Sequence, residues 1–181
     1  GGEKNPFYRG PDIGPRKGVR SPTHSRPDPP SRTDTETDLR LIASSDPSFN
    51  PEVFVDEARK NFQRFQEAWT SRNLESVREL MDEDIFDVCM CDLNALRRER
   101  RINKIENVQI HEVVPIEVWQ EEGFDFITLR YRGSLLDYVI DEVSSNILEG
   151  SATNLDNFVE YWTWARQSGE GQWFLSAMEQ A

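Results

Sequence analysis

The sequence predicts an α+β fold, in which N-terminal helices pack on a curved four-stranded antiparallel sheet. Two observations carry this prediction. From about residue 51 to residue 101 the apolar residues recur with the period of a helix, and from Val108 onward they alternate with the two-residue period of a strand. Helices followed by consecutive strands with short connections are typical of helices packed on an antiparallel meander.

The first 48 residues have a different composition from the rest. They contain eight of the ten prolines (Pro6, Pro11, Pro15, Pro22, Pro27, Pro29, Pro30 and Pro47). Glycine, serine, threonine and arginine surround these prolines, and apolar residues are scarce. Such a segment cannot bury enough apolar surface to offset the entropy of ordering its chain. The sequence therefore predicts a disordered Pro-rich linker over residues 1–48 and a folded domain over residues 49–181.

The folded domain is predicted to open with a helix over residues 51–71. Asn50 supplies a side-chain cap, Pro51 suits the first helical position and Glu52 places an acid in the first turn. Steps of three and four residues then align one aromatic stripe, made of Phe54, Ala58, Phe62, Phe65 and Trp69. A stripe of this kind is stable only against a broad apolar surface, because ordering the helix costs about as much free energy as burying the stripe gains.

Two further helical segments follow. Asn73 can cap a short helix that carries Leu74, Val77, Leu80 and Met81, and helical spacing continues through Ile85, Phe86, Cys89, Leu93 and Leu96. The second segment runs into the basic cluster of residues 96–101, "LRRERR". One interpretation is a solvated last helical turn, where the helix dipole favours cations. The other is a contact with phosphate or lipid.

Four strands are predicted after these helices. The first covers residues 108–118, where Pro115 indicates an edge or a bulge, and the second starts at Phe124 after the turn of residues 120–123. The third covers about residues 155–167. The Gly-rich loop of residues 168–171 leads into the fourth, over residues 172–180.

The predicted strands carry apolar residues on both faces. On the face toward the helix we expect Phe158, Trp162 and Trp164 from the third strand and Trp173 and Leu175 from the fourth. The opposite face is assigned Val159, Tyr161, Ala165, Phe174, Met178, Ile127 and Leu129. Because sheets that are apolar on both faces are usually covered twice, the outer face is expected to meet a partner protein, a twin subunit in a homodimer, or a hydrophobic ligand.

Charge and metal-ligand content exclude several function classes. Residues 49–181 hold 13 basic and 26 acidic side chains, a net charge of −13. A domain of this charge repels phosphate backbones, so no nucleic-acid partner is expected, and it is poorly suited to recognising anionic lipid by charge. Cys89, Cys91, His24 and His111 form no ligand spacing. No metal and no cofactor are therefore predicted.

Two blocks of sequence resemble the Tim44-like domain family. The first, residues 46–80, contains Asp46-Pro47 before Phe49, then Phe54, Ala58, Phe62, Ala68-Trp69, Asn73-Leu74, Val77 and Leu80. The second, residues 159–180, contains Glu160-Tyr161-Trp162-Thr163, Arg166, Trp173 and Leu175. The resemblance covers roughly residues 39–181. It implies the cone of the nuclear-transport-factor-two-like superfamily, a curved sheet packed on helices around an apolar cavity.

The resemblance also implies non-catalytic work at a membrane, in protein translocation or membrane-protein assembly, by binding lipid or a protein partner. The expected cavity lining is Phe62, Phe65, Trp69, Phe126, Phe158, Trp162, Trp164, Trp173 and Leu175. In bacterial relatives a membrane segment and a flexible linker precede the domain. We therefore expect an N-terminal anchor upstream of Gly1, and the bacterial inner membrane rather than the mitochondrial one. The family includes the C-terminal domain of a mitochondrial inner-membrane import subunit, which carries a long charged chaperone-contacting region ahead of this domain. Only the Pro-rich segment stands in that place here, so chaperone recruitment is not carried over.

The alternative is a small cone-fold enzyme of the isomerase or dehydratase type. Glu112 interrupts the apolar even-numbered face of the first strand, and a carboxylate buried there would have a raised pKa and could act as a general base. Thr128, Arg130 and Glu160 could add polar contacts. The competing explanation is structural: a β-bulge returns Glu112 to solvent, or Arg130 pairs with it. We favour the non-catalytic binding domain.

Overall fold

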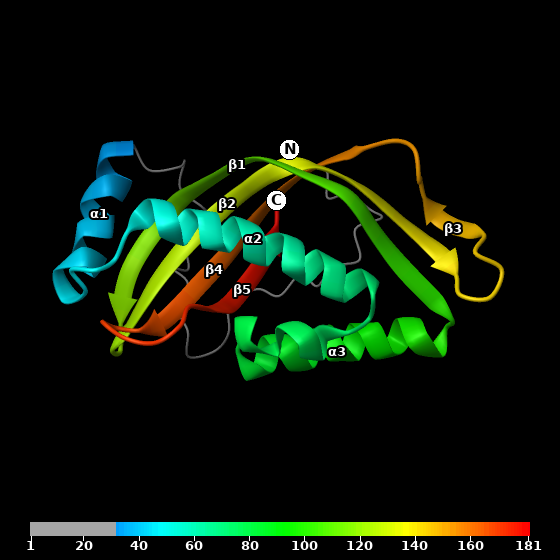
Figure 1. The fold of residues 1–181 in the computed structure, drawn as a ribbon, viewed down its shortest axis with the longest axis horizontal. Coiled ribbons are helices and arrows are strands. Elements are labelled where there is room, and N and C mark those ends of the chain that lie inside the picture. The colour runs from blue at the N-terminus through cyan, green and yellow to red at the C-terminus, as the bar shows by residue number, and fades with distance from the viewer. Residues whose placement is uncertain (1–31) are drawn as a thin grey trace.

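In the computed structural model the described residues are 32–181, with side chains from Leu39 onward. Helices come first: α1 (Arg32–Ser45), α2 (Pro51–Thr70), the 3₁₀ helix η1 (Leu74–Leu80) and α3 (Glu83–Arg98). The strands follow: β1 (Arg101–Glu121), β2 (Phe124–Asp141), β3 (Ile147–Gly150), β4 (Asp156–Gln167) and β5 (Phe174–Gln180). This order confirms the α+β prediction. Figure 1 shows the long strands arching over α2.

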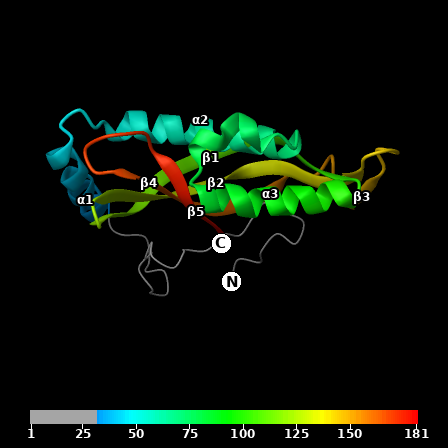
Figure 2. The same cartoon turned by 90° about the horizontal axis from the view of Figure 1, so that it is seen from below.

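Helix α2 forms as its sequence predicts. The Asn50 side chain accepts hydrogen bonds from the backbone N–H groups of Glu52 and Val53, at 3.0 and 3.2 Å, so two of the unsatisfied donors of the first turn are paired. The whole predicted stripe is buried. Figure 2 shows α2 lying along one face of the sheet. The stripe belongs to the buried cluster between the helix and the sheet.

The sheet has the strand order β1-β2-β4-β5, with all pairs antiparallel, and β3 pairs with the far end of β2. Cross-strand register fixes which side chains share a face. Leu129 lies opposite Trp162, and Ile127 lies opposite Trp164, so these residues face α2 together. The expectation that Ile127 and Leu129 belong to the outer face is therefore wrong.

Met178 was expected on the outer face and also lies on the inner one. It pairs with Trp162, while Leu175 pairs with Trp164, and the register of β4 and β5 shifts between Thr163 and Trp164. This shift breaks the strict alternation of β5, so that Leu175 and Met178 both enter the core. Sequence alternation alone placed them on opposite faces.

Strand β1 is longer and less regular than predicted. It begins at Arg101, and its register against β2 shifts at three places, between Glu106 and Gln109, Ile110 and Glu112, and Pro115 and Glu117. Each shift moves the following side chains to the other face. Next to these bulges, a Cβ on Gly133 of β2 would stand 2.0 Å from the Gln109 carbonyl oxygen. Glycine at this position therefore lets β1 bend closely over β2.

Two elements lie outside the predicted plan. Helix α1 falls inside the segment expected to be a linker, and Ile42 of α1 is fully buried, so the folded part begins before residue 49. The remainder of the predicted linker, residues 1–31, lies outside the described residues and stays a prediction. Strand β3 adds a fifth strand, which forms a hairpin with the end of β2.

Candidate functional site: an aromatic groove at one end of the sheet

Most of the predicted cavity-lining residues pack on one another in the core. The Phe62 ring lies 4.6 Å from the Trp162 ring and 5.4 Å from the Phe158 ring, measured between centroids, and the Phe65 ring lies 5.3 Å from Trp162. Trp69 and Leu175 belong to the same buried cluster. Because these rings contact each other between α2 and the sheet, their first role is to hold the helix on the sheet. A ligand role for them stays a prediction.

Phe126 does not lie with the other predicted residues. It lies opposite Ala165 of β4 and opposite Trp119 of β1. The centroids of the Trp119 and Phe126 rings lie 4.9 Å apart, and all three side chains face away from α2. The prediction that Phe126 lines the same cavity as Trp162 and Trp164 is therefore wrong. The face of Phe126 was predicted from the alternation of residues at the start of β2, without the register that pairing with β4 imposes.

The buried tryptophans use their indole N–H groups inside the core. Trp69 donates to Asn103 Oδ1 at 3.0 Å, Trp162 to Glu160 Oε2 at 2.8 Å, and Trp164 to the Tyr131 hydroxyl at 3.1 Å. Tyr131 in turn donates to the Ala58 carbonyl of α2, and burial raises the pKa of its phenol. These bonds fix each ring in one orientation, which suits a rigid wall rather than an adaptable pocket.

A groove opens where this core meets the chain that enters α2. Its volume is about 270 Å³, and its apolar lining comes from Phe49, Val53, Phe54, Ala58, Trp164 and Trp173. The rings of Phe54 and Trp173 lie 4.8 Å apart, and Phe49 lies 5.9 Å from Phe54 and 6.0 Å from Trp173. Of the predicted ligand-binding residues, the groove brings together Trp164 and Trp173.

Sequence reasoning missed Phe49 and Val53 as groove residues, although a local signal for Phe49 was present. Phe49 precedes the N-cap Asn50, and Phe54 is the fourth residue of the helix. Apolar residues at these two positions commonly contact each other and fix the direction in which the chain enters a helix. The ring contact between Phe49 and Phe54 is that arrangement.

A buried arginine closes the inner end of the groove. Arg166 pairs with Asp46 at 3.0 Å and with Asp125 at 3.4 Å, and only 8% of its side chain is exposed. Its guanidinium also lies 4.6 Å from the centre of the Trp173 ring and 5.6 Å from that of Phe49. Arg166 therefore ties the segment before α2 to β2 and β4, and it holds two groove aromatics by cation–π contact.

The carboxylates beside Arg166 are well supported. Asp125 is fully buried and also accepts hydrogen bonds from Gln120 at 2.7 Å and from Ser168 at 2.8 Å. The Ser48 hydroxyl, followed by Arg166, holds the pKa of Asp46 below its ordinary value. Asp46 is thus kept charged at neutral pH, and Arg166 joins it to Asp125 in an ion-pair network at the inner end of the groove.

A second, smaller hollow lies on the outer face of the sheet. Its volume is about 170 Å³, and Phe124, Phe126 and Phe174 line it together with Ala165 and Ser176. Asp82, Glu121 and Glu122 also line it. This aromatic hollow lies on the face for which a partner was predicted, and the partner itself stays a prediction.

Glu112 does not have the environment that a buried general base requires. The register shift after Ile110 turns it to the outer face, where its carboxylate pairs with Arg130 at 2.7 Å and with Arg132 at 2.9 Å. Arg130, assisted by Arg132, lowers the pKa of Glu112. A carboxylate with a lowered pKa is a weak base at neutral pH, so the hypothesis that Glu112 acts as a buried base is wrong.

Metal and thiol chemistry find little support in residues 39–181. Within this range no group of three histidine, cysteine, aspartate or glutamate side chains is arranged to hold a metal ion. Cys89 is buried, and burial raises its pKa to about 12, so it remains a thiol; Cys91 is exposed.

The Tim44-like domain matches residues 35–180, which include both sequence blocks, the aromatic core and the groove. The chain belongs to the Tim44-like domain family. Membership extends the domain into α1, in agreement with the burial of Ile42. It implies a role associated with protein import or assembly at a membrane.

Among solved structures, the Tim44-like domain is similar to a crystal structure of the intermembrane space region of the chloroplast protein ARC6. The identity is 12% and the TM-score is 0.46, over 70% of this chain and 95% of that one. No curated protein sequence matches the chain. The described part of the Tim44-like domain contains no helix of the length and apolarity needed to cross a bilayer.

Proposed function

We propose that this Tim44-like domain is a non-catalytic binding module at a membrane surface. It supports protein translocation or membrane-protein assembly by holding a hydrophobic ligand in the aromatic groove. The observation that carries the proposal is the groove itself, in which Phe49, Phe54 and Trp173 surround a volume of about 270 Å³ beside the exposed Val53. The predicted membrane location, reached through an N-terminal anchor, remains part of this proposal.

The size of the groove limits the ligand. Sites for whole drug-sized ligands usually enclose about 300 to 1,000 Å³. At about 270 Å³ the groove instead accommodates one hydrocarbon chain or one large side chain. A lysolipid, which has a single acyl chain, fits this limit better than a two-chain lipid does.

The polar lining of the groove favours some head groups over others. Asp46 and Glu57 line it together with the neutral Ser48, Asn50 and Asn61. Among the described residues Arg166 is the one cation that lines it, and Arg166 already pairs with Asp46 and Asp125. A head group that is neutral, zwitterionic or cationic therefore avoids the repulsion that a free carboxylate would meet here. We commit to a single-chain zwitterionic lipid, lysophosphatidylcholine, as the probe.

Tryptophan fluorescence can report occupancy directly, because Trp164 and Trp173 line the groove. The full chain is titrated with short-chain lysophosphatidylcholine below the concentration at which micelles form. We expect a saturable change in emission. Val53→Asp should weaken binding at least about tenfold, because it places a charge in the apolar groove. Since Val53 is 56% exposed, the substitution leaves the core intact.

Val88→Asp is the matched control for this titration. Val88 is 43% exposed on α3 and does not line the groove, so its substitution should leave lysolipid binding unchanged. An absence of saturable binding by the unmodified protein would contradict the proposal, as would equal weakening by both substitutions. Native mass spectrometry of protein purified from its own cells gives a second outcome: a co-purified polypeptide in place of lipid would assign the groove to a protein segment.

The homodimer proposal concerns the outer face and is tested separately. Phe124 is 38% exposed at the hollow that Phe126 and Phe174 also line. If this face joins two copies, sedimentation velocity should show a dimer that Phe124→Glu dissociates. A monomer at all concentrations would remove the homodimer without affecting the groove.

A further inference from the structure

The β2–β3 hairpin exposes three aliphatic side chains together. Val143 in the turn is 75% exposed, and Ile147 and Leu148 at the start of β3 are 51% and 46% exposed. Single exposed aliphatic residues are ordinary on a protein surface, but several within one short hairpin indicate a contact site. Figure 1 places this hairpin at the end of the long axis opposite α1.

Arginines surround the base of the same hairpin. Arg97 and Arg98 end α3, Arg100 and Arg101 lead into β1, and Arg72 follows α2. The backbone N–H of Glu142 donates to the Arg100 carbonyl at 2.8 Å, which joins the hairpin turn to this arginine cluster. The basic run that the sequence left with two interpretations therefore stands beside the exposed aliphatic residues.

The acids at this end are already engaged. Glu142 pairs with Arg72 at 2.7 Å, Glu149 with Arg101 at 3.4 Å, and Glu99 with Arg101 at 3.6 Å. The Asp141 carboxylate accepts hydrogen bonds from the backbone N–H groups of Val143 and Ser144, which shape the turn.

Two other arginines at this end, Arg97 and Arg98, are exposed. Within residues 39–181, Arg97 and Arg98 form no ion pair, although Arg97 donates to the Arg72 carbonyl. Five arginines (Arg72, Arg97, Arg98, Arg100 and Arg101) stand here with five acids (Glu99, Asp137, Asp141, Glu142 and Glu149), so this end is close to neutral within a domain (residues 49–181) of −13.

We propose that the hairpin end docks on the anionic surface of a lipid bilayer, with Val143, Ile147 and Leu148 entering the interface and Arg97, Arg98 and Arg100 contacting lipid phosphates. Aliphatic residues flanked by arginine suit the boundary between head groups and acyl chains. Each basic residue near an anionic surface strengthens binding about fivefold. A specific protein interface buries about 1,200 to 2,000 Å² in total, more than a hairpin tip readily offers, whereas a bilayer sets no such minimum.

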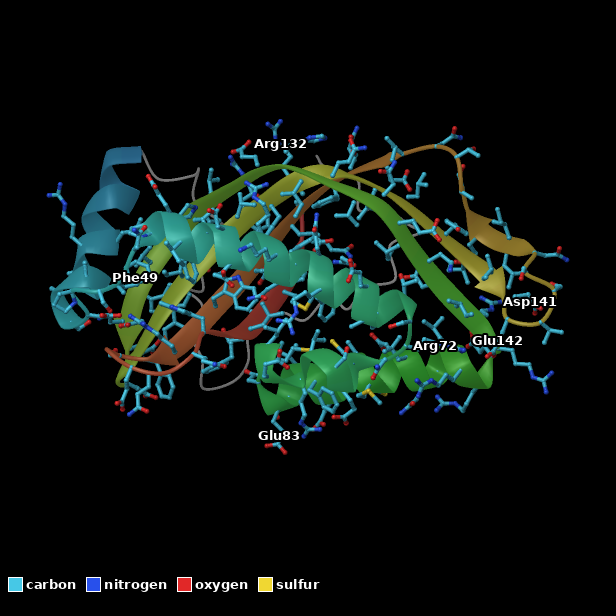
Figure 3. All side chains as sticks on the ribbon, viewed as in Figure 1. Phe49, Arg72, Glu83, Arg132, Asp141 and Glu142 are labelled. Carbon is cyan, nitrogen blue, oxygen red and sulfur yellow. The ribbon has the colours of Figure 1, made fainter. Side chains whose placement is uncertain are left out.

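The negative charge of the rest of the domain does not prevent this contact. Charges in solvent are largely screened beyond about 8 Å at physiological ionic strength. Figure 3 labels Arg72, Asp141 and Glu142 at the hairpin end and Phe49, next to the groove, at the other end of the long axis. The groove acids therefore lie far from a bilayer that meets the hairpin.

Vesicle flotation of the full chain tests the proposal. Vesicles of phosphatidylcholine with a minority of phosphatidylglycerol should bind the protein, and vesicles of phosphatidylcholine alone should bind it more weakly. The double variant Val143→Ser with Ile147→Ser should bind at least about tenfold more weakly, because two interfacial aliphatic side chains are lost. Arg98→Glu should also weaken binding and reduce its dependence on salt.

The control is Leu41→Ser with Val88→Ser, whose parent side chains are 49% and 43% exposed outside the hairpin. It should bind vesicles as the unmodified protein does. Absence of binding to anionic vesicles would overturn the proposal, and so would binding that the hairpin variant leaves unchanged. Sedimentation velocity covers the competing occupant: a dimer that the hairpin variant dissociates would assign the tip to a second copy.

This inference does not depend on the ligand of the groove. Val53→Asp should weaken lysolipid binding and leave flotation intact, whereas the hairpin variant should weaken flotation and leave lysolipid binding intact. If Val53→Asp abolished flotation and the hairpin variant did not, the groove end would be the membrane-facing one. That result would overturn the hairpin assignment and leave the proposed function standing.

Discussion

The groove end and the hairpin end of this Tim44-like domain use arginine in opposite ways. At the groove, Arg166 is buried between Asp46 and Asp125 and lies against two aromatic rings. At the hairpin, Arg97 and Arg98 are exposed, and no carboxylate within the described residues pairs with them. An arginine of the first kind holds a structure together, whereas arginines of the second kind are free to meet a partner.

This difference shows why net charge alone misjudges partners. The charge of −13 over residues 49–181 indicated that anionic lipid would be recognised poorly by charge. That charge is an average over two ends with different arrangements. At the hairpin end Arg72 pairs with Glu142 and Arg101 with Glu149, so part of the acidic charge is balanced locally. Local pairing, which sequence counts cannot show, decides what each end attracts.

The largest expected effect comes from removing the buried arginine. Arg166→Leu leaves the fully buried Asp125 without its cation, and breaking a buried pair in this way costs about 3 to 5 kcal/mol. Denaturant unfolding should show this loss of stability, and the groove aromatics should lose their fixed arrangement. Arg98→Leu at the hairpin end should change the free energy of unfolding by less than about 0.5 kcal/mol. Equal losses would mean that the two arginines do not differ as described.

A smaller loss of stability is expected from substituting either of two glycines, one at each end of the domain. Gly150 of the hairpin has a φ of +76°, and an added Cβ would stand 2.3 Å from the Asp137 carbonyl oxygen. Gly171, in the loop before Trp173, has a φ of +86° but nothing within 4 Å of an added Cβ. Gly171→Ala should therefore cost only the left-handed conformation, about 1 to 2 kcal/mol. Gly150→Ala should cost more, because backbone must also move.

Hydrogen exchange separates these two glycine variants. Gly150→Ala should speed exchange of the β2 and β3 amides near Tyr138 and weaken vesicle flotation, because β3 pairs with β2 through that segment. Gly171→Ala should affect only the loop between β4 and β5. Protection of β3 that is unchanged in Gly150→Ala would show that the hairpin tolerates the contact and does not need β3 in this position.

Helix α2 and its aromatic stripe could be predicted from the sequence because their determinants are local. The cap at Asn50 and the spacing from Phe54 to Trp69 lie within one helix, and the predicted bounds differ from the observed ones by a single residue. The tryptophan core could be predicted as well, because a stripe of that kind needs an apolar sheet beneath it. The family resemblance added the fold of the whole domain.

What the sequence could not supply was strand register. The bulges in β1 and β5 exist only against their partner strands, and they decide that Glu112 faces outward and Met178 inward. The ion pair between Arg166 and Asp46 joins residues 120 positions apart, so no local pattern points to it. Strand β3 is four residues long and carries little alternation. The groove depends on that ion pair, which is why it was found only in the structure.

The smallest expected effect is a loss of folding stability in acid at the groove end. The Ser48 hydroxyl, then Arg166, lowers the pKa of Asp46, whereas Arg72 lowers that of Glu142 at the hairpin end. A carboxyl with a lowered folded-state pKa stabilises the fold at higher pH, and this contribution is lost as the pH falls through that pKa. Both ends should therefore weaken below about pH 4.

Ser48→Ala tests whether the two ends titrate independently. It removes the first support of the Asp46 carboxylate, so the pKa of Asp46 should rise toward its ordinary value and acid unfolding should begin at a higher pH. Carboxyl NMR titration should show this rise while the pKa of Glu142 stays unchanged. Ser44→Ala is the control, because that hydroxyl donates to the Leu41 carbonyl instead. A shift of both carboxyl groups in Ser48→Ala would mean that the groove and the hairpin respond to acid as one unit.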